Sequence, residues 1–246
     1  MFYISHIGRI YNICYIFNCS TQAEITHMET QILENKLNET RDTLIELESL
    51  KTDIKFISNK ETEYFSEVVE KSAFFYRIYR NSIKLFVIDI CKLLNPNEDF
   101  SLLKTLNYIQ SNRKRIEWKR ELKAERINEL ILEIENLNSK HLESFKNLRD
   151  KHYAHNDKKK FDLEYNVTLK KCWETLLIAQ EIFIELNLSL LNQQYVFSIL
   201  TKEPYEIISL LKYKRINEIL LTELKKSPDL GNLQMVRDIT LGKKPA

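Results

Sequence analysis

The amino-acid sequence predicts an all-α protein, an antiparallel bundle of long helices with a small helical appendage at the C-terminal end. The 246 residues include only three glycines and four prolines, and no glycine lies between Arg9 and Leu230. Because the turns of β-hairpins favour glycine at positive φ, this scarcity disfavours sheets. Apolar residues recur instead at three- and four-residue steps, which is the spacing of one helical face.

The predicted helices follow one another with short polar breaks. Asn95-Pro96-Asn97 marks one break, because proline disfavours helical backbone in the residue before it. Ser111 and Asn112 are favourable N-cap residues, so a long helix is expected to follow them to about Leu148. The predicted helices cover residues 21–58, 62–94, 99–110, 113–148 and 165–191, followed by short ones over 205–211 and 215–224.

Three of these helices carry apolar faces that predict the core. We expect the 62–94 helix to be central, and the aromatic run Phe74-Phe75-Tyr76 within it to be buried. The apolar positions are Phe75, Ile78, Tyr79, Phe86, Ile90 and Leu93 in that helix; Ile127, Leu130, Ile131, Ile134, Leu137, Leu142, Phe145 and Leu148 in the next long one; and Leu169, Trp173, Leu176, Ala179, Phe183, Leu186 and Leu190 in the last.

The chain is expected to divide into three parts. Residues 1–27 form a poorly ordered or peripheral leader, because His6, Arg9 and Asn12 interrupt an apolar run that is too short to span a bilayer. Met28 offers an alternative start. Residues 28–194 form the helical domain, and residues 195–246 form a helical tail. The four cysteines make no Cys-x-x-Cys pair and lie mostly in apolar segments, which indicates reduced thiols in a cytoplasmic protein with no membrane partner.

One short stretch, Arg149-Asp150-Lys151-His152-Tyr153-Ala154-His155, carries the predicted chemistry. The net charge of the whole chain is +2, so any nucleic-acid surface must be local. Around this stretch the local charge is +4, and a basic patch rich in histidine suits phosphate. The charged residues between 146 and 160 are Lys146, Arg149, Lys151, Lys158, Lys159 and Lys160 against Asp150 and Asp157.

Histidine and arginine together can cleave RNA without a metal. A neutral imidazole, which titrates near pH ~6.5, can take the proton of a ribose 2′-hydroxyl. A guanidinium stays charged and stabilises the phosphate oxygens in the transition state. On a straight α-helix, however, Arg149 and His155 would lie about 120° apart in azimuth and roughly 9 Å apart along the axis. Either a helix starts within the stretch, or a second chain completes the site.

The string LRDKHYAHND resembles the abortive-infection U-type branch of the HEPN superfamily, in which an Arg-x-Lys-His-x-Ala-His-x-Asp pattern recurs. The upstream string FFYRIYRNSIKLFVIDICKLLNPNEDFSLLKTL resembles the same branch, with a long apolar helix, a polar break and a short helix rich in serine and leucine. The resemblance covers about residues 62–191. It implies a HEPN-like helical bundle and places the chain among ribonucleases and nucleotide-binding proteins.

The resemblance also implies roles for individual residues. Arg149 would stabilise the scissile phosphate, His155 would act as general base or acid, and Asp150 would orient a catalytic group. RNA contacts would come from Lys151, His152, Lys158, Lys159 and Lys160. The protein would be a metal-independent, cofactor-free endoribonuclease in phage defence or a toxin–antitoxin pair. It would work as a homodimer with facing motifs, with RNA as substrate and a cognate antitoxin protein as a further partner.

Other interpretations of the same residues stay open. His155 alone could be a surface histidine without a task. His152 and His155 could bind zinc with help from His141, Glu143 or Asp157, although no recognised ligand spacing is present. The fold could also serve a non-catalytic module that binds RNA, a nucleotide or a partner protein. A structural protein could instead use its charged helix, and changes at Lys119 and Arg126 would then matter more than changes at His155.

Overall fold

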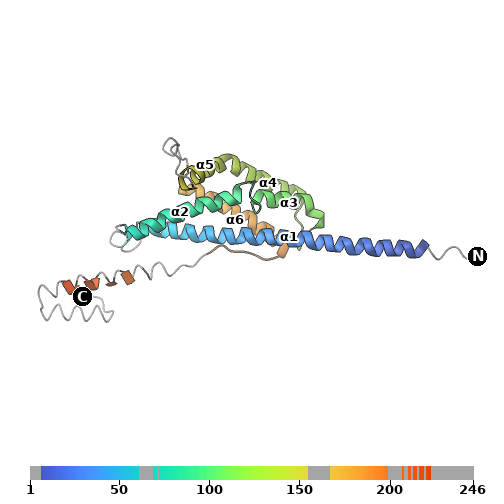
Figure 1. Ribbon diagram of the computed structural model, residues 1–246, viewed down its shortest axis with the longest axis horizontal. Helices are drawn as coiled ribbons and strands as arrows, with labels where there is room; N and C mark the ends of the chain where they lie inside the picture. The colour runs from blue at the N-terminus through green and yellow to red at the C-terminus, as the bar shows by residue number, and fades with distance from the viewer. Residues whose placement is uncertain are drawn as a thin grey trace, which may run out of the picture. The chain divides into compact units, whose positions relative to one another are not determined.

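In the computed structural model of the chain, all the secondary-structure elements of the described part are helices, joined by turns and irregular segments (Figure 1). The structure describes the backbone of residues 7–60, 69–70, 72–154 and 167–198, with separate positions between 207 and 222, and side chains from residue 24 onward except those of 151, 152 and 154. No strand occurs in these ranges, so the predicted all-α class is confirmed.

The contacts divide the chain into two compact units. The first comprises Met1–Lys51 with Ser82–Ser198, and the second comprises Thr52–Asn81 with Ile199–Ala246. The three-part division expected from the sequence remains a prediction. The helices are α1 (Ile7–Ser58), α2 (Ala73–Leu94), α3 (Leu102–Asn112), α4 (Ala124–Leu137), α5 (Glu143–Asn147) and α6 (Leu169–Leu191), with a 3₁₀ turn η2 (Arg113–Arg115) and two π-helical turns, η3 (Asn138–Leu142) and η4 (Leu148–Ala154).

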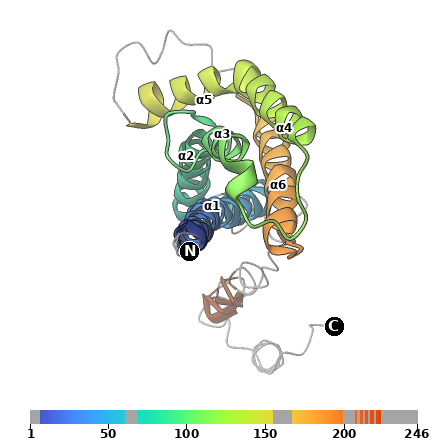
Figure 2. The ribbon, with the colours of Figure 1, turned by 90° about the vertical axis from the view of Figure 1, so that its right-hand side faces the viewer.

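In the first unit, polar side chains link helices that are far apart in the sequence. Figure 2 shows α3 over α1, with α6 beside α1 and α4 next to α6. The Gln180 amide on α6 donates to the Glu48 carboxylate on α1 at 2.9 Å. Arg126 on α4 holds Glu185 on α6 through two hydrogen bonds of 2.7 and 2.6 Å. These bonds tie α6 to a neighbour on each side.

In this unit most of the apolar positions predicted from the sequence are buried and form the core, whereas Leu169 and Trp173 are partly buried. Every predicted position from Ile127 to Leu148 is buried except Ile131, which is partly buried. Phe86 on α2 meets Trp173 on α6 edge to face, with ring centroids 5.1 Å apart. Cys91 and Cys172 are buried free thiols, as the sequence predicted for these two cysteines.

The predicted N-cap at Ser111 and Asn112 is wrong. Both residues lie in the last turn of α3, and residues 113–123 form a 3₁₀ turn and an irregular segment before α4 begins at Ala124. Long-range bonds hold this segment, because the Glu117 amide donates to the Thr30 hydroxyl at 2.9 Å and the Arg120 amide donates to a carbonyl of α6 at 2.9 Å. Capping propensity is a local signal, and these tertiary contacts override it.

The second unit has a small apolar cluster of its own. Phe56 and Ile57 at the end of α1 pack with Val69 and Phe75, and two partly buried residues of α2, Ile78 and Tyr79, cover the cluster. The predicted burial of the whole run Phe74-Phe75-Tyr76 is wrong for its two outer members, because Phe74 and Tyr76 are 55% and 59% exposed. Only the central ring of the run points toward the cluster, as helical geometry requires.

Within the described ranges, none of the helices combines the length and the apolar character that crossing a bilayer needs.

Candidate functional site

The candidate motif begins on η4, a π-helical turn that follows α5 directly. A second π-helical turn, η3, lies just before α5. In a π-helix each N–H bonds to the carbonyl five residues earlier, and such turns are rare and frequent at functional sites. The straight α-helix assumed for the spacing of Arg149 and His155 is therefore not the conformation of residues 148–154. The predicted alternative in which a helix starts within the stretch is wrong for residues 149–154, because helical backbone continues into η4 directly from α5. The other alternative, a second chain that completes the site, stays a prediction.

Arg149 and Asp150 form an ion pair on η4. The Arg149 Nε donates to Asp150 Oδ1 at 2.6 Å, and the two side chains are 21% and 49% exposed. This hydrogen bond raises the pKa of the Arg149 guanidinium above its already high ordinary value. Among the described residues, the guanidinium has no other hydrogen-bond partner. Its two Nη groups therefore remain able to bind an anion.

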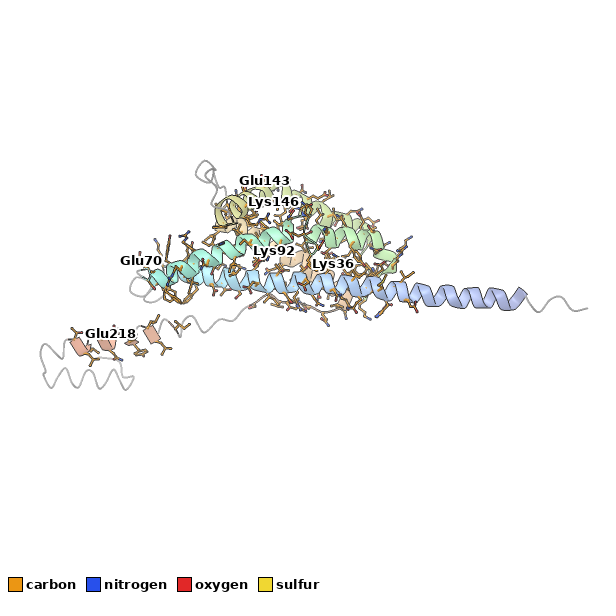
Figure 3. The ribbon with its side chains drawn as sticks, viewed as in Figure 1. Lys36, Glu70, Lys92, Glu143, Lys146 and Glu218 are labelled. Atoms are coloured by element: carbon orange, nitrogen blue, oxygen red, sulfur yellow. The ribbon has the colours of Figure 1, made fainter. Side chains whose placement is uncertain are left out.

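The Arg149 guanidinium lies close to the C-terminal end of α2. Burial raises the pKa of the Cys91 thiol to about 12, and the positive charges of Arg149 and Lys146 oppose that rise. The Glu98 carboxylate, in the turn after α2, also acts on Arg149. Figure 3 labels Lys146 on α5 and Lys92 on α2, the helices on either side of this region. The arginine is thus held between η4 and α2 and does not extend freely into solvent.

The remaining predicted site residues lie outside what the structure describes. This is true of His155, Lys158, Lys159 and Lys160 entirely, and of the side chains of Lys151 and His152. Their roles, and the distance from Arg149 to His155, stay predictions. Within the described ranges, no three His, Cys, Asp or Glu side chains gather as metal ligands would. The zinc interpretation depends on His152 and His155 and is not tested by this finding.

Sequence reasoning missed a groove in the first unit. Its volume is about 620 Å³, and it opens between α4, η3 and α6. His141 on η3 lines it, and the pKa of this imidazole is lowered by burial and then by the nearby charges of Lys171 and Lys140. The remaining lining residues are Glu129, Leu132, Glu133, Asn136, Leu137, Lys140, Glu174 and Ile178. The only sequence signal was the three- and four-residue spacing of the acids and leucines on α4.

The fold and the motif were compared with known proteins. The HEPN_AbiU2 family model, described as AbiU2, matches residues 31–208. The chain belongs to the AbiU2 family of HEPN proteins. No curated protein and no solved structure matches it significantly. The resemblance seen in LRDKHYAHND is thereby confirmed, and the AbiU2 match extends beyond residues 62–191 at both ends.

The AbiU2 match includes η4 and the Arg149–Asp150 pair. In this AbiU2 chain the pair offers one permanent positive charge with its Nε group already bonded and both Nη groups pointing elsewhere. Such a fork suits two oxygens of one phosphate. By itself it can bind and stabilise a phosphodiester, but it cannot remove a proton, since a guanidinium does not titrate near neutral pH. Proton transfer to or from a bound phosphodiester would therefore require a second, titratable side chain.

Proposed function

We propose that this AbiU2-family protein is a metal-independent endoribonuclease that cleaves RNA by attack of a 2′-hydroxyl on the adjacent phosphate. The observation that carries the proposal is the family match, because it covers the Arg149–His155 stretch. The Arg149–Asp150 pair supports it, since it leaves both Nη groups of the guanidinium for a phosphate. The π-helical path of η4 supports it as well, because such turns are frequent at functional sites.

The proposed reaction needs two proton transfers. Neutral His155 takes the proton of the 2′-hydroxyl, the 2′-oxygen bonds to phosphorus, and the bond from phosphorus to the 5′-oxygen breaks. A protonated imidazole gives its proton to that leaving oxygen. Arg149 stabilises the negative charge on the phosphoryl oxygens, and Asp150 holds Arg149 in position. The products are a 2′,3′-cyclic phosphate and a free 5′-hydroxyl.

A homodimer is part of the proposal. One histidine cannot begin as both base and acid, whereas two motifs that face each other supply both. In that arrangement Lys151, His152, Lys158, Lys159 and Lys160 hold the RNA backbone. The proposed activity serves phage defence or a toxin–antitoxin pair in the cytoplasm, with a cognate antitoxin protein as its inhibitor; the AbiU2 match supports this setting.

The test is cleavage of RNA in EDTA by the wild-type protein and by single variants. His155→Ala and Arg149→Ala should each lower the rate by about 10²–10⁴-fold, the usual effect of losing general-base help or a transition-state charge. His141→Ala is the matched control, because it removes an imidazole from the groove between α4 and α6, outside the motif. Its rate should stay at the wild-type value. The product ends should be cyclic phosphates.

Equal cleavage by all variants would refute the assignment. RNA binding that depends on salt, without cleavage by any form of the protein, would support the alternative of a non-catalytic binding module. Circular dichroism must show unchanged helix content for Arg149→Ala, because this side chain is partly buried near α2.

A further inference from the structure

The first turns of α2, in the second unit, present an exposed face of aromatic and arginine side chains. Phe74 and Tyr76 are each more than half exposed, and Arg77 and Arg80 are exposed as well. At 100° per residue, the arginines lie opposite the buried Phe75, and the two aromatic rings flank them on either side. We call these four residues the α2 aromatic–arginine face.

Both rings are held by a neighbour. Phe74 meets the buried Phe75 edge to face, with ring centroids 5.5 Å apart. The guanidinium carbon of Arg80 lies 5.7 Å from the centre of the Tyr76 ring. An exposed aromatic ring that is already braced loses little conformational entropy when a flat partner stacks on it. The Phe74 and Tyr76 rings are therefore preorganised to stack with a flat ligand.

In the described part of the chain, no carboxylate pairs with the arginines of this face. Residues 73–81 contain two arginines and no acidic residue. Neither Arg77 nor Arg80 forms an ion pair with a carboxylate among the described residues, whereas Arg113, Arg126 and Arg149 each do. Two guanidinium groups without a described carboxylate partner, one of them against the Tyr76 ring, combine a phosphate-binding charge with a stacking surface.

We propose that the α2 aromatic–arginine face binds single-stranded RNA, with bases stacked on Phe74 and Tyr76 and phosphates at Arg77 and Arg80. This deepens the proposed ribonuclease function, on which it rests, by naming the form of the substrate. Unpaired bases expose their faces to aromatic side chains, whereas the bases of a duplex are already stacked. The two rings lie on opposite edges of a helix about 10–12 Å wide, so one strand crosses α2 between them.

The experiment measures binding of a fluorescent, unstructured oligouridylate by fluorescence anisotropy over a range of salt concentrations. The full-length chain carries His155→Ala throughout so that the probe is not cleaved. The double variant Phe74→Leu/Tyr76→Leu should weaken binding by at least about fivefold, the lower end for one lost stacking contact. Tyr76→Phe keeps the ring and should bind as the parent does. A double-stranded probe of the same length should bind equally to all of these proteins.

A second part of the experiment tests the two arginines through the dependence of the binding constant on salt concentration. Arg77→Gln/Arg80→Gln removes two phosphate contacts and should lower the slope of log K against log salt by about 1.4, at about 0.7 per contact for single strands. The matched control, Lys119→Gln/Lys123→Gln, removes two exposed charges from the first unit and should leave the slope unchanged. Equal slope changes in both pairs would overturn the proposal, because they would indicate non-specific attraction.

Two further outcomes would also overturn it. Unchanged binding by the leucine double variant would show that no base stacks there. A shift of that variant to a smaller assembly in sedimentation, with RNA binding intact, would assign the face to a protein contact, since aromatic and arginine residues also dominate protein interfaces. Either result leaves the cleavage test at His155 unaffected, so failure of this proposal and failure of the ribonuclease assignment are separable.

Discussion

Replacing Asp150 with alanine should lower cleavage far more than it lowers stability. The Asp150 carboxylate accepts the Nε hydrogen bond of Arg149 at 2.6 Å. Because Asp150 is 49% exposed, solvent screens the pair, and its loss should cost about 1 kcal/mol or less in the free energy of unfolding. For a chain of this size that is a fall in Tm of roughly 2–4 °C.

The effect on catalysis should be larger, because the pair sets the position of the guanidinium. Misplacing a catalytic group by about 1 Å can cost about 10²-fold in rate. Without its acceptor, Arg149 keeps its charge but loses the bond that orients it. We therefore expect a fall in kcat of about 10- to 100-fold for Asp150→Ala. The kcat of Asp150→Asn should lie between those of the wild type and Asp150→Ala, since asparagine keeps an acceptor oxygen but loses the charge that strengthens the bond.

The chain contains a matched control for this experiment. Arg41 and Asp42 on α1 are also sequence neighbours, and their hydrogen bond from Nε to Oδ1 is 2.9 Å. Asp42→Ala removes the same kind of pair away from the motif. Thermal melts followed by circular dichroism, and RNA cleavage at saturating substrate, should be measured for both variants. Asp42→Ala should melt slightly earlier and cleave at the wild-type rate.

The reasoning would be refuted if Asp150→Ala cleaved RNA at the wild-type rate while melting a few degrees earlier. Asp150 would then act only on stability. A fall in Tm of more than about 10 °C would be a different refutation, because it would mean that the pair supports the packing of η4 against α2.

Two further predictions concern a hydrogen bond between α1 and α6 and the titration of His141 beside α6. Glu48→Ala should lower the free energy of unfolding in urea by about 1–3 kcal/mol, because the buried Gln180 amide loses its acceptor. The double variant Glu48→Leu/Gln180→Leu should lower the free energy of unfolding by less than the sum of the two single changes. A double variant whose effect equals that sum would contradict this. The His141 imidazole lies near Lys140, Lys171 and Glu174, and its pKa is lowered in the folded protein. It therefore binds fewer protons in the folded state than in the unfolded state. Stability should therefore rise with pH through the interval just below its ordinary pKa of 6.5, and His141→Gln should flatten that rise in the urea midpoint. Parallel pH curves for the two proteins would count against it.

Much of the fold could be predicted because it depends on local periodicity. The stripe from Ile127 to Leu148 lies buried as predicted, apart from the partly buried Ile131, even though the π-helical turn η3 interrupts the α-helix that carries it. The N-cap at Ser111 and Asn112 could not be judged locally, because bonds to Thr30 and to α6 hold the segment that follows. The predicted burial of Phe74 and Tyr76 was wrong because three consecutive residues of a helix point in different directions. Only one of the three rings can therefore lie on the buried face.

The candidate site divides in the same way. By itself, the sequence determined that the helices are amphipathic, that the chain resembles the HEPN branch, and which seven residues carry the motif. Only the tertiary structure decided that Arg149 lies near Cys91 on α2 and Glu98 in the turn after α2, that Asp150 bonds to it, and that a groove opens between α4 and α6. The spacing of apolar residues can be read from residues that are neighbours in the sequence. The partner of a charged side chain, in contrast, depends on which distant segments lie next to it after folding.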